Sequence, residues 1–121
     1  LVVKEYPILA ETSVLAAKAA IAAQRQGKFE QFHIALMTWR GRIDTKAIDA
    51  AGRKAGLDST TLRADMEDDL TAAIINRTRD AAAALEIRGT PALIIGETVI
   101  PGAISKNEIL DLINQTRTAK N

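Results

Sequence analysis

The segment EIRGTPALIIGETVIPGA, residues 86–103, differs in character from every other part of this 121-residue sequence. Alanine-rich stretches with helical spacing precede it, whereas the segment itself combines glycine, proline and β-branched residues. Residues 92–95 and 98–100 predict two β-strands, and Gly96-Glu97 between them suits a type II′ hairpin turn because glycine comes first. Gly89-Thr90-Pro91 stands directly before the first strand, although proline fixes φ and offers no N–H to a ladder. This strand entrance is therefore a candidate for a functional role as well as a structural one.

The remainder of the sequence predicts helices and one further strand. Apolar residues at helical spacing favour helices over residues 12–26, 28–40, 45–55 and 69–85. Residues 1–5 are apolar and β-branched, which is typical of a strand, and Pro7 ends it. The predicted order is a strand, five helices, a β-hairpin and a helix, which is an α/β chain with a helical insertion.

Capping residues indicate where several of these helices begin and end. Asp44 or Thr45 caps the third helix, and Gly56 is expected directly after its end. Ser59 is the expected cap of a short fourth helix. Ser105 caps the last one, where a glutamate three residues later completes a capping box.

Composition excludes several classes of function. The 16 basic and 15 acidic residues nearly balance and form no basic block, and aromatic residues make up only 3%, so no nucleic-acid surface is indicated. No apolar run approaches the roughly 20 residues that span a bilayer. The sequence contains no cysteine, which excludes disulfides, thiolate metal sites and cysteine nucleophiles within these residues. We expect no metal site and no cofactor.

The order of three sequence stretches carries a family resemblance. VVKEYPIL, SVLAAKAAIAAQRQGKFEQFHIALM and EIRGTPALIIGETVIPGAISKNEILDLI together resemble the DsbA-like thiol:disulfide oxidoreductases over essentially the whole chain. The pattern GTPAxxIG…xxPGA is the most specific part, and GKFEQFHIALM is the next. The resemblance implies a thioredoxin-like fold with an inserted helical subdomain. Residues 1–10 would hold a core strand, residues 11–68 the helical insertion, and residues 69–121 a connecting helix, the hairpin and the C-terminal helix.

The same resemblance assigns a role to the strand entrance. In thioredoxin folds the proline at this position follows a cis peptide bond, and its loop faces the catalytic Cys-x-x-Cys. Gly89, Thr90 and Pro91 are accordingly the expected substrate-binding residues, with the backbone of Thr90 pairing with an extended polypeptide by β-augmentation. The alternative is that Pro91 only begins a strand, which the positional rules for proline allow.

The chain departs from the family pattern in lacking the redox dithiol. The family carries its cysteines after an earlier strand, at the start of the first core helix, upstream of the segment matched by Leu1. We therefore expect a chain that lacks this strand and helix, has no catalytic residue of its own, and is part of a periplasmic or cell-envelope oxidoreductase. Two alternatives are a redox-inactive thioredoxin-like peptide-binding or chaperone module, and a relative of the glutathione-dependent kappa-class transferases and isomerases.

Other polar residues are expected to be structural. His33 shares a helical stripe with Phe29, Phe32, Leu36 and Met37, which favours a half-buried packing histidine over a metal ligand. Residues 67–69 are acidic and begin a helix, where negative charge complements the helix dipole. Arginines 77, 79 and 88 are expected on solvated faces. Glu5 ends the first strand, near the place where thioredoxin folds hold an acidic group, but we expect no role for it.

The missing strand also leads to an expectation about assembly. In the thioredoxin core it lies between the strand matched by residues 1–5 and the hairpin, so the edges of residues 2–4 and 93–95 would be unpaired. An exposed apolar edge is a template for intermolecular pairing. We expect a homodimer or a strand-exchanged oligomer, or else a rearranged sheet in which the first strand pairs directly with the hairpin.

Overall fold

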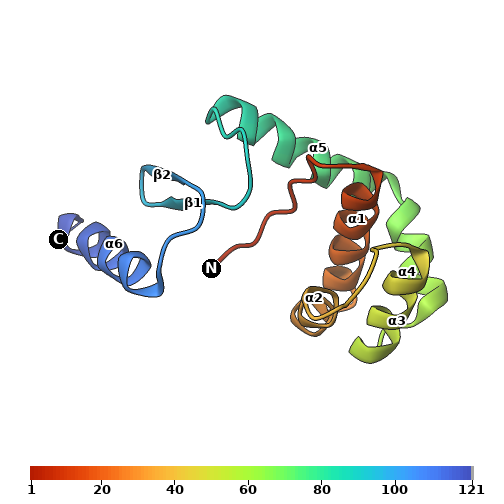
Figure 1. Ribbon diagram of the computed structural model, residues 1–121. Coiled ribbons are helices and arrows are strands. Elements are labelled where there is room, and N and C mark those ends of the chain that lie inside the picture. The colour runs from red at the N-terminus through yellow and green to blue at the C-terminus, as the bar shows by residue number, and fades with distance from the viewer. Residues whose placement is uncertain (121) are drawn as a thin grey trace. The chain divides into compact units, whose positions relative to one another are not determined.

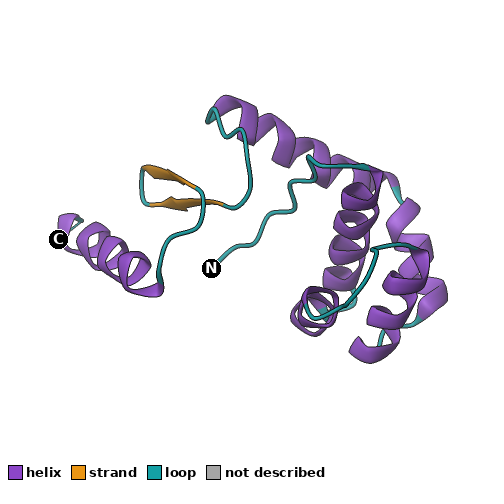
Figure 2. Cartoon of the chain, in the orientation of Figure 1, coloured by secondary structure: helices purple, strands orange, loops and turns teal. Residues whose placement is uncertain are grey.

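The protein is described by a computed structural model that covers residues 1–120. The chain divides into two compact units, Leu1–Arg79 and Asp80–Asn121. Helices α1–α4 and most of α5 belong to the first unit, and the hairpin and α6 belong to the second (Figure 1 and Figure 2). The elements in chain order are α1 (Glu11–Arg25), α2 (Phe29–Met37), α3 (Thr45–Ala55), α4 (Ser59–Glu67), α5 (Asp69–Ala84), β1 (Ala92–Ile95), β2 (Thr98–Pro101) and α6 (Lys106–Ala119).

The first unit is a helical bundle in which α1 contacts α2, α3 and α4 (Figure 1). The buried face of α1 includes alanines at positions 19, 20, 22 and 23, and such small side chains let the neighbouring helices approach closely. Phe32 on α2 and Leu62 on α4 are the largest apolar side chains that are fully buried. Burial of these side chains gives the first unit a hydrophobic core of its own.

Side-chain and backbone caps set the boundaries of α3 and α4. Asp44 accepts the N–H three residues on at 3.0 Å, and Gly56 ends α3 in the left-handed conformation with φ 74°, as predicted. Asp58 caps α4 by accepting the N–H of Thr61 at 2.7 Å, so the prediction that Ser59 is the cap is wrong by one residue. Both residue types are good caps, and a carboxylate gains further from the helix dipole.

Helix α2 is shorter than predicted and buries a narrower face. It ends at Met37, and the following Thr38 hydroxyl donates hydrogen bonds to the carbonyl oxygens of Ile34 at 2.8 Å and Ala35 at 3.2 Å. The Met37 side chain is 66% exposed, so its predicted place on the buried stripe is wrong. Met37 directly follows the buried Leu36, and consecutive residues of a helix point about 100° apart.

The acidic run at residues 67–69 lies at the junction of α4 and α5. Asp68 accepts the N–H of Leu70 at 2.8 Å and pairs with Arg25 of α1 at 3.0 Å. Both interactions lower the pKa of Asp68, the bond from the Leu70 N–H more than the one from Arg25. The predicted structural role of this run is confirmed. Within residues 1–120, no group of His, Asp and Glu side chains is placed to hold a metal ion.

The second unit is built around an antiparallel hairpin. Its register pairs Ala92 with Pro101 and Ile95 with Thr98, so β2 runs one residue further than predicted. Gly96 has φ 63° and Glu97 does not have a positive φ, which agrees with the type II′ turn. A Cβ on Gly96 would lie 2.7 Å from the methyl carbon of Thr116 in α6, so this turn needs glycine for packing as well as for conformation.

Helix α6 begins with the predicted capping box. The Ser105 hydroxyl oxygen accepts the N–H of Glu108 at 3.2 Å, and the Glu108 carboxylate accepts the N–H of Ser105 at 2.8 Å. Within residues 1–120 no helix is long and apolar enough to cross a bilayer.

The predicted core strand within residues 1–10 is not formed. The sheet among residues 1–120 contains only β1 and β2, and the segment before α1 has no regular secondary structure. The rearranged sheet with the first strand against the hairpin is therefore also absent. A β-branched segment is stabilised as a strand only by a neighbour that pairs with its backbone, and no such neighbour is present here.

Candidate functional site

The loop toward the strand entrance leaves α5 through a Schellman motif. The N–H of Ile87 donates to the carbonyl of Ala82 at 2.8 Å, and the N–H of Glu86 donates to Ala83 at 3.1 Å. These two bonds are the pair that defines the motif, and Glu86 holds the left-handed position with φ 55°. Glycine is usual at this position, because a side chain there is strained. The sequence predicts the end of this helix to within one residue, but nothing in it signals the left-handed conformation of Glu86.

Gly89, Thr90 and Pro91 form an exposed bend directly before β1. The peptide bond between Thr90 and Pro91 is cis. The carbonyl of Pro91 accepts the N–H of Gly102 at 2.9 Å, which extends the hairpin ladder by one rung beyond the strands. Among residues 1–120, the amide and carbonyl groups of Gly89 and Thr90 form no hydrogen bond. The bend is thus anchored at Pro91 and open at Thr90.

The register of the hairpin determines which backbone groups of β1 face outward. The two-residue turn makes Ile95 and Thr98 a hydrogen-bonded pair, and hydrogen-bonded and non-hydrogen-bonded pairs then alternate along the ladder. The backbone groups of Ala92 and Ile94 consequently point away from β2. They form a free edge that is continuous in sequence with the open backbone of Thr90.

The outer edge of β2 is different, because Pro101 lies on it. Pro101 pairs with Ala92 at a non-hydrogen-bonded position, so its missing N–H is on the side away from β1 and costs the ladder no bond. The free edge of β1 therefore offers both donors and acceptors, whereas proline interrupts the edge of β2.

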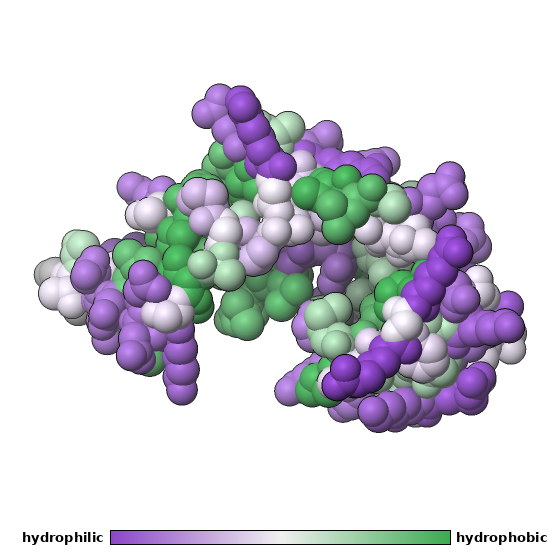
Figure 3. Space-filling view, viewed as in Figure 1, coloured by the Kyte–Doolittle hydropathy of each residue, from purple (hydrophilic) through white to green (hydrophobic). Residues whose placement is uncertain are grey.

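Apolar side chains accompany the free edge. Ile94 is 55% exposed, and its cross-strand neighbour Val99 is half-buried. Leu110 of α6 is exposed as well, and no residue of α6 is fully buried. Figure 3 shows hydrophobic surface over the hairpin, coloured green. The hairpin therefore presents apolar surface together with hydrogen-bonding backbone.

Glu5 and His33 belong to the first unit, whereas Gly89, Thr90 and Pro91 belong to the second. Burial raises the pKa of the Glu5 carboxyl, and the charge of His33 lowers it in part. The ring of His33 stacks on Phe29 with centroids 5.4 Å apart and an interplanar angle of 20°. A half-buried histidine that stacks on a phenylalanine is the predicted packing residue. The three arginines at positions 77, 79 and 88 are exposed, as predicted.

Comparison with known protein families gives a match over residues 3–114, to the DSBA-like thioredoxin domain. The chain belongs to this DsbA-like family. No curated protein matches the chain.

Solved structures support membership of the DsbA-like family. A thioredoxin-like oxidoreductase from Silicibacter pomeroyi DSS-3 is 36% identical with a TM-score of 0.90, and the match covers 95% of this chain and 66% of that one. A periplasmic thioredoxin-like protein from Salmonella enterica serovar Typhimurium is 31% identical, with a TM-score of 0.83 and coverage of 95% and 64%. The thiol-disulfide exchange protein alpha-DsbA2 from Wolbachia pipientis is 28% identical, with a TM-score of 0.86 and coverage of 93% and 62%. The chain thus spans 62–66% of the length of these three proteins.

The DsbA-like chain has a thioredoxin-like fold of helices and a two-stranded sheet, and it contains no cysteine. Thiol–disulfide exchange needs a thiolate, so its own residues cannot perform the exchange. The sequence prediction does not include one residue, on the other side of the hairpin, that supports the candidate loop. Gly102 holds the carbonyl of Pro91, and extending the II′ register by two rungs beyond residue 100 would have identified it.

Proposed function

We propose that this chain is part of a thiol:disulfide oxidoreductase that acts on proteins, in which it supplies the substrate-binding loop Gly89-Thr90-Pro91. The observation that supports this proposal is the open backbone of Thr90 beside the free edge of β1. An extended polypeptide can add to such an edge as a further strand, with main-chain hydrogen bonds providing affinity. Apolar substrate side chains would then contact the exposed Ile94.

The redox step belongs to cysteines outside this sequence. In the exchange, a thiolate attacks one sulfur of a disulfide, a new S–S bond forms, and the other sulfur leaves as a thiolate. The loop contributes by holding the substrate backbone in a fixed extended form, which lowers the entropic cost of the attack. The similar Salmonella protein is described as periplasmic, which supports the proposal that this chain acts in the cell envelope.

Amide resonances of the loop provide a sharp test of substrate binding. An extended cysteine-free peptide in excess should displace a second copy of the chain from this edge and shift the amide resonances of Thr90, Ala92 and Ile94. The amides of Leu93 and Ile95, which face β2, should remain unchanged. Pro91→Ala should weaken this binding, whereas Pro101→Ala, on the other strand, is the matched control and should not. Equal effects along both sets of amides, or equal losses in both variants, would contradict pairing at the β1 edge.

An insulin-reduction assay tests the location of the chemistry. The chain alone should give no turnover above the blank, because it has no thiol. Turnover by pure chain, with contamination excluded, would refute this assignment. A Cys-x-x-Cys motif elsewhere in the parent protein would support the proposal that the parent is a thiol:disulfide oxidoreductase.

The lack of cysteine also favours a second candidate, a redox-inactive thioredoxin-like module that binds peptides through the same loop. Its distinguishing result is peptide binding without a dithiol anywhere in the parent protein. Saturable glutathione binding would instead support the kappa-class alternative.

We also propose that the isolated chain associates through the edge of β1, as a homodimer or a strand-exchanged oligomer. The support is the combination of an open edge with the exposed Ile94. Light scattering at low micromolar concentration should show a mass above 13.0 kDa. A stable monomer at these concentrations would contradict the proposal.

A further inference from the structure

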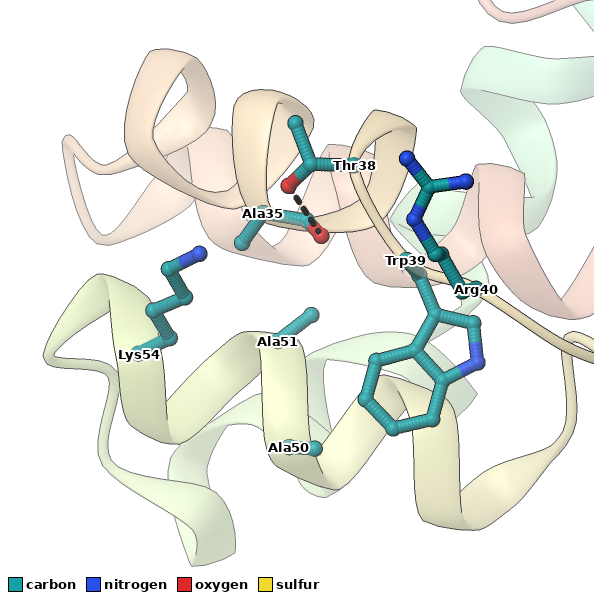
Figure 4. A pocket seen from close by; sticks show the side chains of 7 residues that line it. All are labelled: Ala35, Thr38, Trp39, Arg40, Ala50, Ala51 and Lys54. Carbon is teal, nitrogen blue, oxygen red and sulfur yellow. Dashed lines mark hydrogen bonds between the residues drawn. The ribbon is translucent and has the colours of Figure 1, made fainter.

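A cavity of about 350 Å³ lies between the C-terminal end of α2 and α3, within the first unit (Figure 4). Its middle is formed by small side chains, Ala35 from α2 and Ala50 and Ala51 from α3. Methyl groups at these three positions leave room between two packed helices without breaking their contact. The cavity, which we call the α2–α3 pocket, lies at the lower end of the volumes typical of ligand sites.

Trp39 provides an aromatic wall at one end of the α2–α3 pocket (Figure 4). The indole Nε1 donates a hydrogen bond to the carbonyl of Arg42 at 3.3 Å, which fixes the orientation of the ring and satisfies its polar atom. The side chain remains 38% exposed, so the ring offers apolar surface to a ligand. Trp39 is the only tryptophan of the chain.

Two cations line the α2–α3 pocket, and neither forms an ion pair with a carboxylate of residues 1–120. Arg40 lies next to Trp39, and Lys54 extends from α3 at the opposite end of the pocket (Figure 4). No acidic side chain is among the lining residues. The ion pairs of the described residues use other cations of this unit, at positions 18, 25 and 63. The pocket therefore combines unneutralised positive charge with an apolar centre.

We propose that the α2–α3 pocket, which contains no residue of the Thr90–Pro91 loop, binds an acidic segment of a partner polypeptide. Because Lys54 and Arg40 lie at opposite ends (Figure 4), one carboxylate cannot pair with both. Two acidic residues can, when an apolar residue lies between them at alternate positions of an extended segment, because alternate side chains face the same side. The apolar side chain between them contacts Trp39 and the alanines. Charged groups on a surface of this kind give specificity and a salt-dependent encounter rate.

Fluorescence of Trp39 reports occupancy directly. Titration of the chain with the peptide acetyl-EGLGE-amide, whose three larger side chains share one face when extended, should give a saturable change. The neutral acetyl-QGLGQ-amide should give none at the same concentrations. Lys54→Gln and Arg40→Gln should each weaken binding by about three- to fivefold, which is the upper range for an exposed ion pair. Raising the salt concentration should weaken binding further through screening.

Arg53→Gln is the matched control, because Arg53 is adjacent to Lys54 and exposed but does not line the pocket. Circular dichroism establishes that each variant keeps its helices. Equal binding of both peptides, or an equal loss in the control, overturns the proposal. So does the absence of both a fluorescence change and amide shifts at Ala50 and Ala51 with millimolar peptide. Equally tight binding of succinate would assign the pocket to a small dicarboxylate, and a fluorescence change with protein concentration alone would assign it to a second copy.

Discussion

The helical unit and the hairpin unit of this chain differ in how they are stabilised. The first has its own core, with Phe32 and Leu62 removed from solvent on neighbouring helices. In the second, α6 buries no residue fully, and Ile94 and Leu110 remain exposed. One unit has hydrophobic burial to hold it together, whereas the other keeps apolar surface and backbone groups available for binding.

Core truncation should show this difference most strongly. Phe32→Ala should destabilise the first unit by about 3–5 kcal/mol, because it removes contacts and leaves a cavity. Ile94→Ala, its counterpart on the hairpin, should change stability by less than about 0.5 kcal/mol. Urea unfolding followed by Trp39 fluorescence and by circular dichroism measures both. A large loss for Ile94→Ala would mean that the hairpin face is buried in solution.

Loss of the cap of α6 should lower the stability of its helix more than loss of a cap in the bundle does, because α6 buries no residue fully. Ser105→Ala removes the acceptor for the N–H of Glu108 and should cost about 1 kcal/mol of helix stability. Amide exchange in the first turn of α6 should accelerate accordingly. Ser105→Asp, which retains a capping acceptor, should leave the exchange near the wild-type rate; no acceleration in the alanine variant would show that the box is not formed.

The same cap should make α6 sensitive to acid. Interactions with the side chain and backbone of Ser105 lower the pKa of Glu108 below its ordinary value. A lowered folded-state pKa means that the stabilisation is present above the ordinary value and is lost as the pH falls through the lowered one. Glu108→Gln preserves a capping side chain without a charge, so the difference in α6 exchange between the two proteins should disappear in acid. A side-chain carbon titration of Glu108 with an ordinary midpoint would contradict this.

The smallest effect is expected at the end of α5. Glu86→Gly removes a side chain from the left-handed position of the Schellman motif and should stabilise the chain by up to about 1 kcal/mol. Glu97→Gly, at a turn residue without a positive φ, is the control and should give no such gain. Thermal unfolding of the two variants is the measurement, and destabilisation by Glu86→Gly would show that the Glu86 side chain makes a contact of its own.

Local signals were predictable from the sequence, and long-range pairing was not. The cap at Ser105 and the glycine turn at Gly96 depend on residues within four positions, so residue type alone identifies them. For α3 the sequence predicts a cap at Asp44 or Thr45, and the structure shows that Asp44 is the one used. The strand expected at residues 1–5 depends on a partner far away in sequence, and without it the segment has no regular structure. At α4, two neighbouring residues are both good caps, and sequence does not decide between them.

The same difference between local and long-range signals applies to the candidate site and the α2–α3 pocket. Gly89, Thr90 and Pro91 are expected from a family pattern, and the structure adds the hydrogen bond that the Gly102 N–H donates to the carbonyl of Pro91. The α2–α3 pocket has no sequence signal, because Arg40 and Lys54 are 14 positions apart and only helix packing brings them to one cavity. The left-handed conformation of Glu86 was likewise not predictable, since a glutamate gives no indication of a positive φ.

The proline on β2 limits how far copies of this hairpin can stack. Two β1 edges can pair around a two-fold axis, and each then uses its complete set of donors and acceptors. The outward edges of that pair are both β2, where Pro101 leaves a gap in the donor row. In the dimer proposed above, further edge-to-edge addition would therefore meet an interrupted donor row on both sides, which disfavours growth into a fibre.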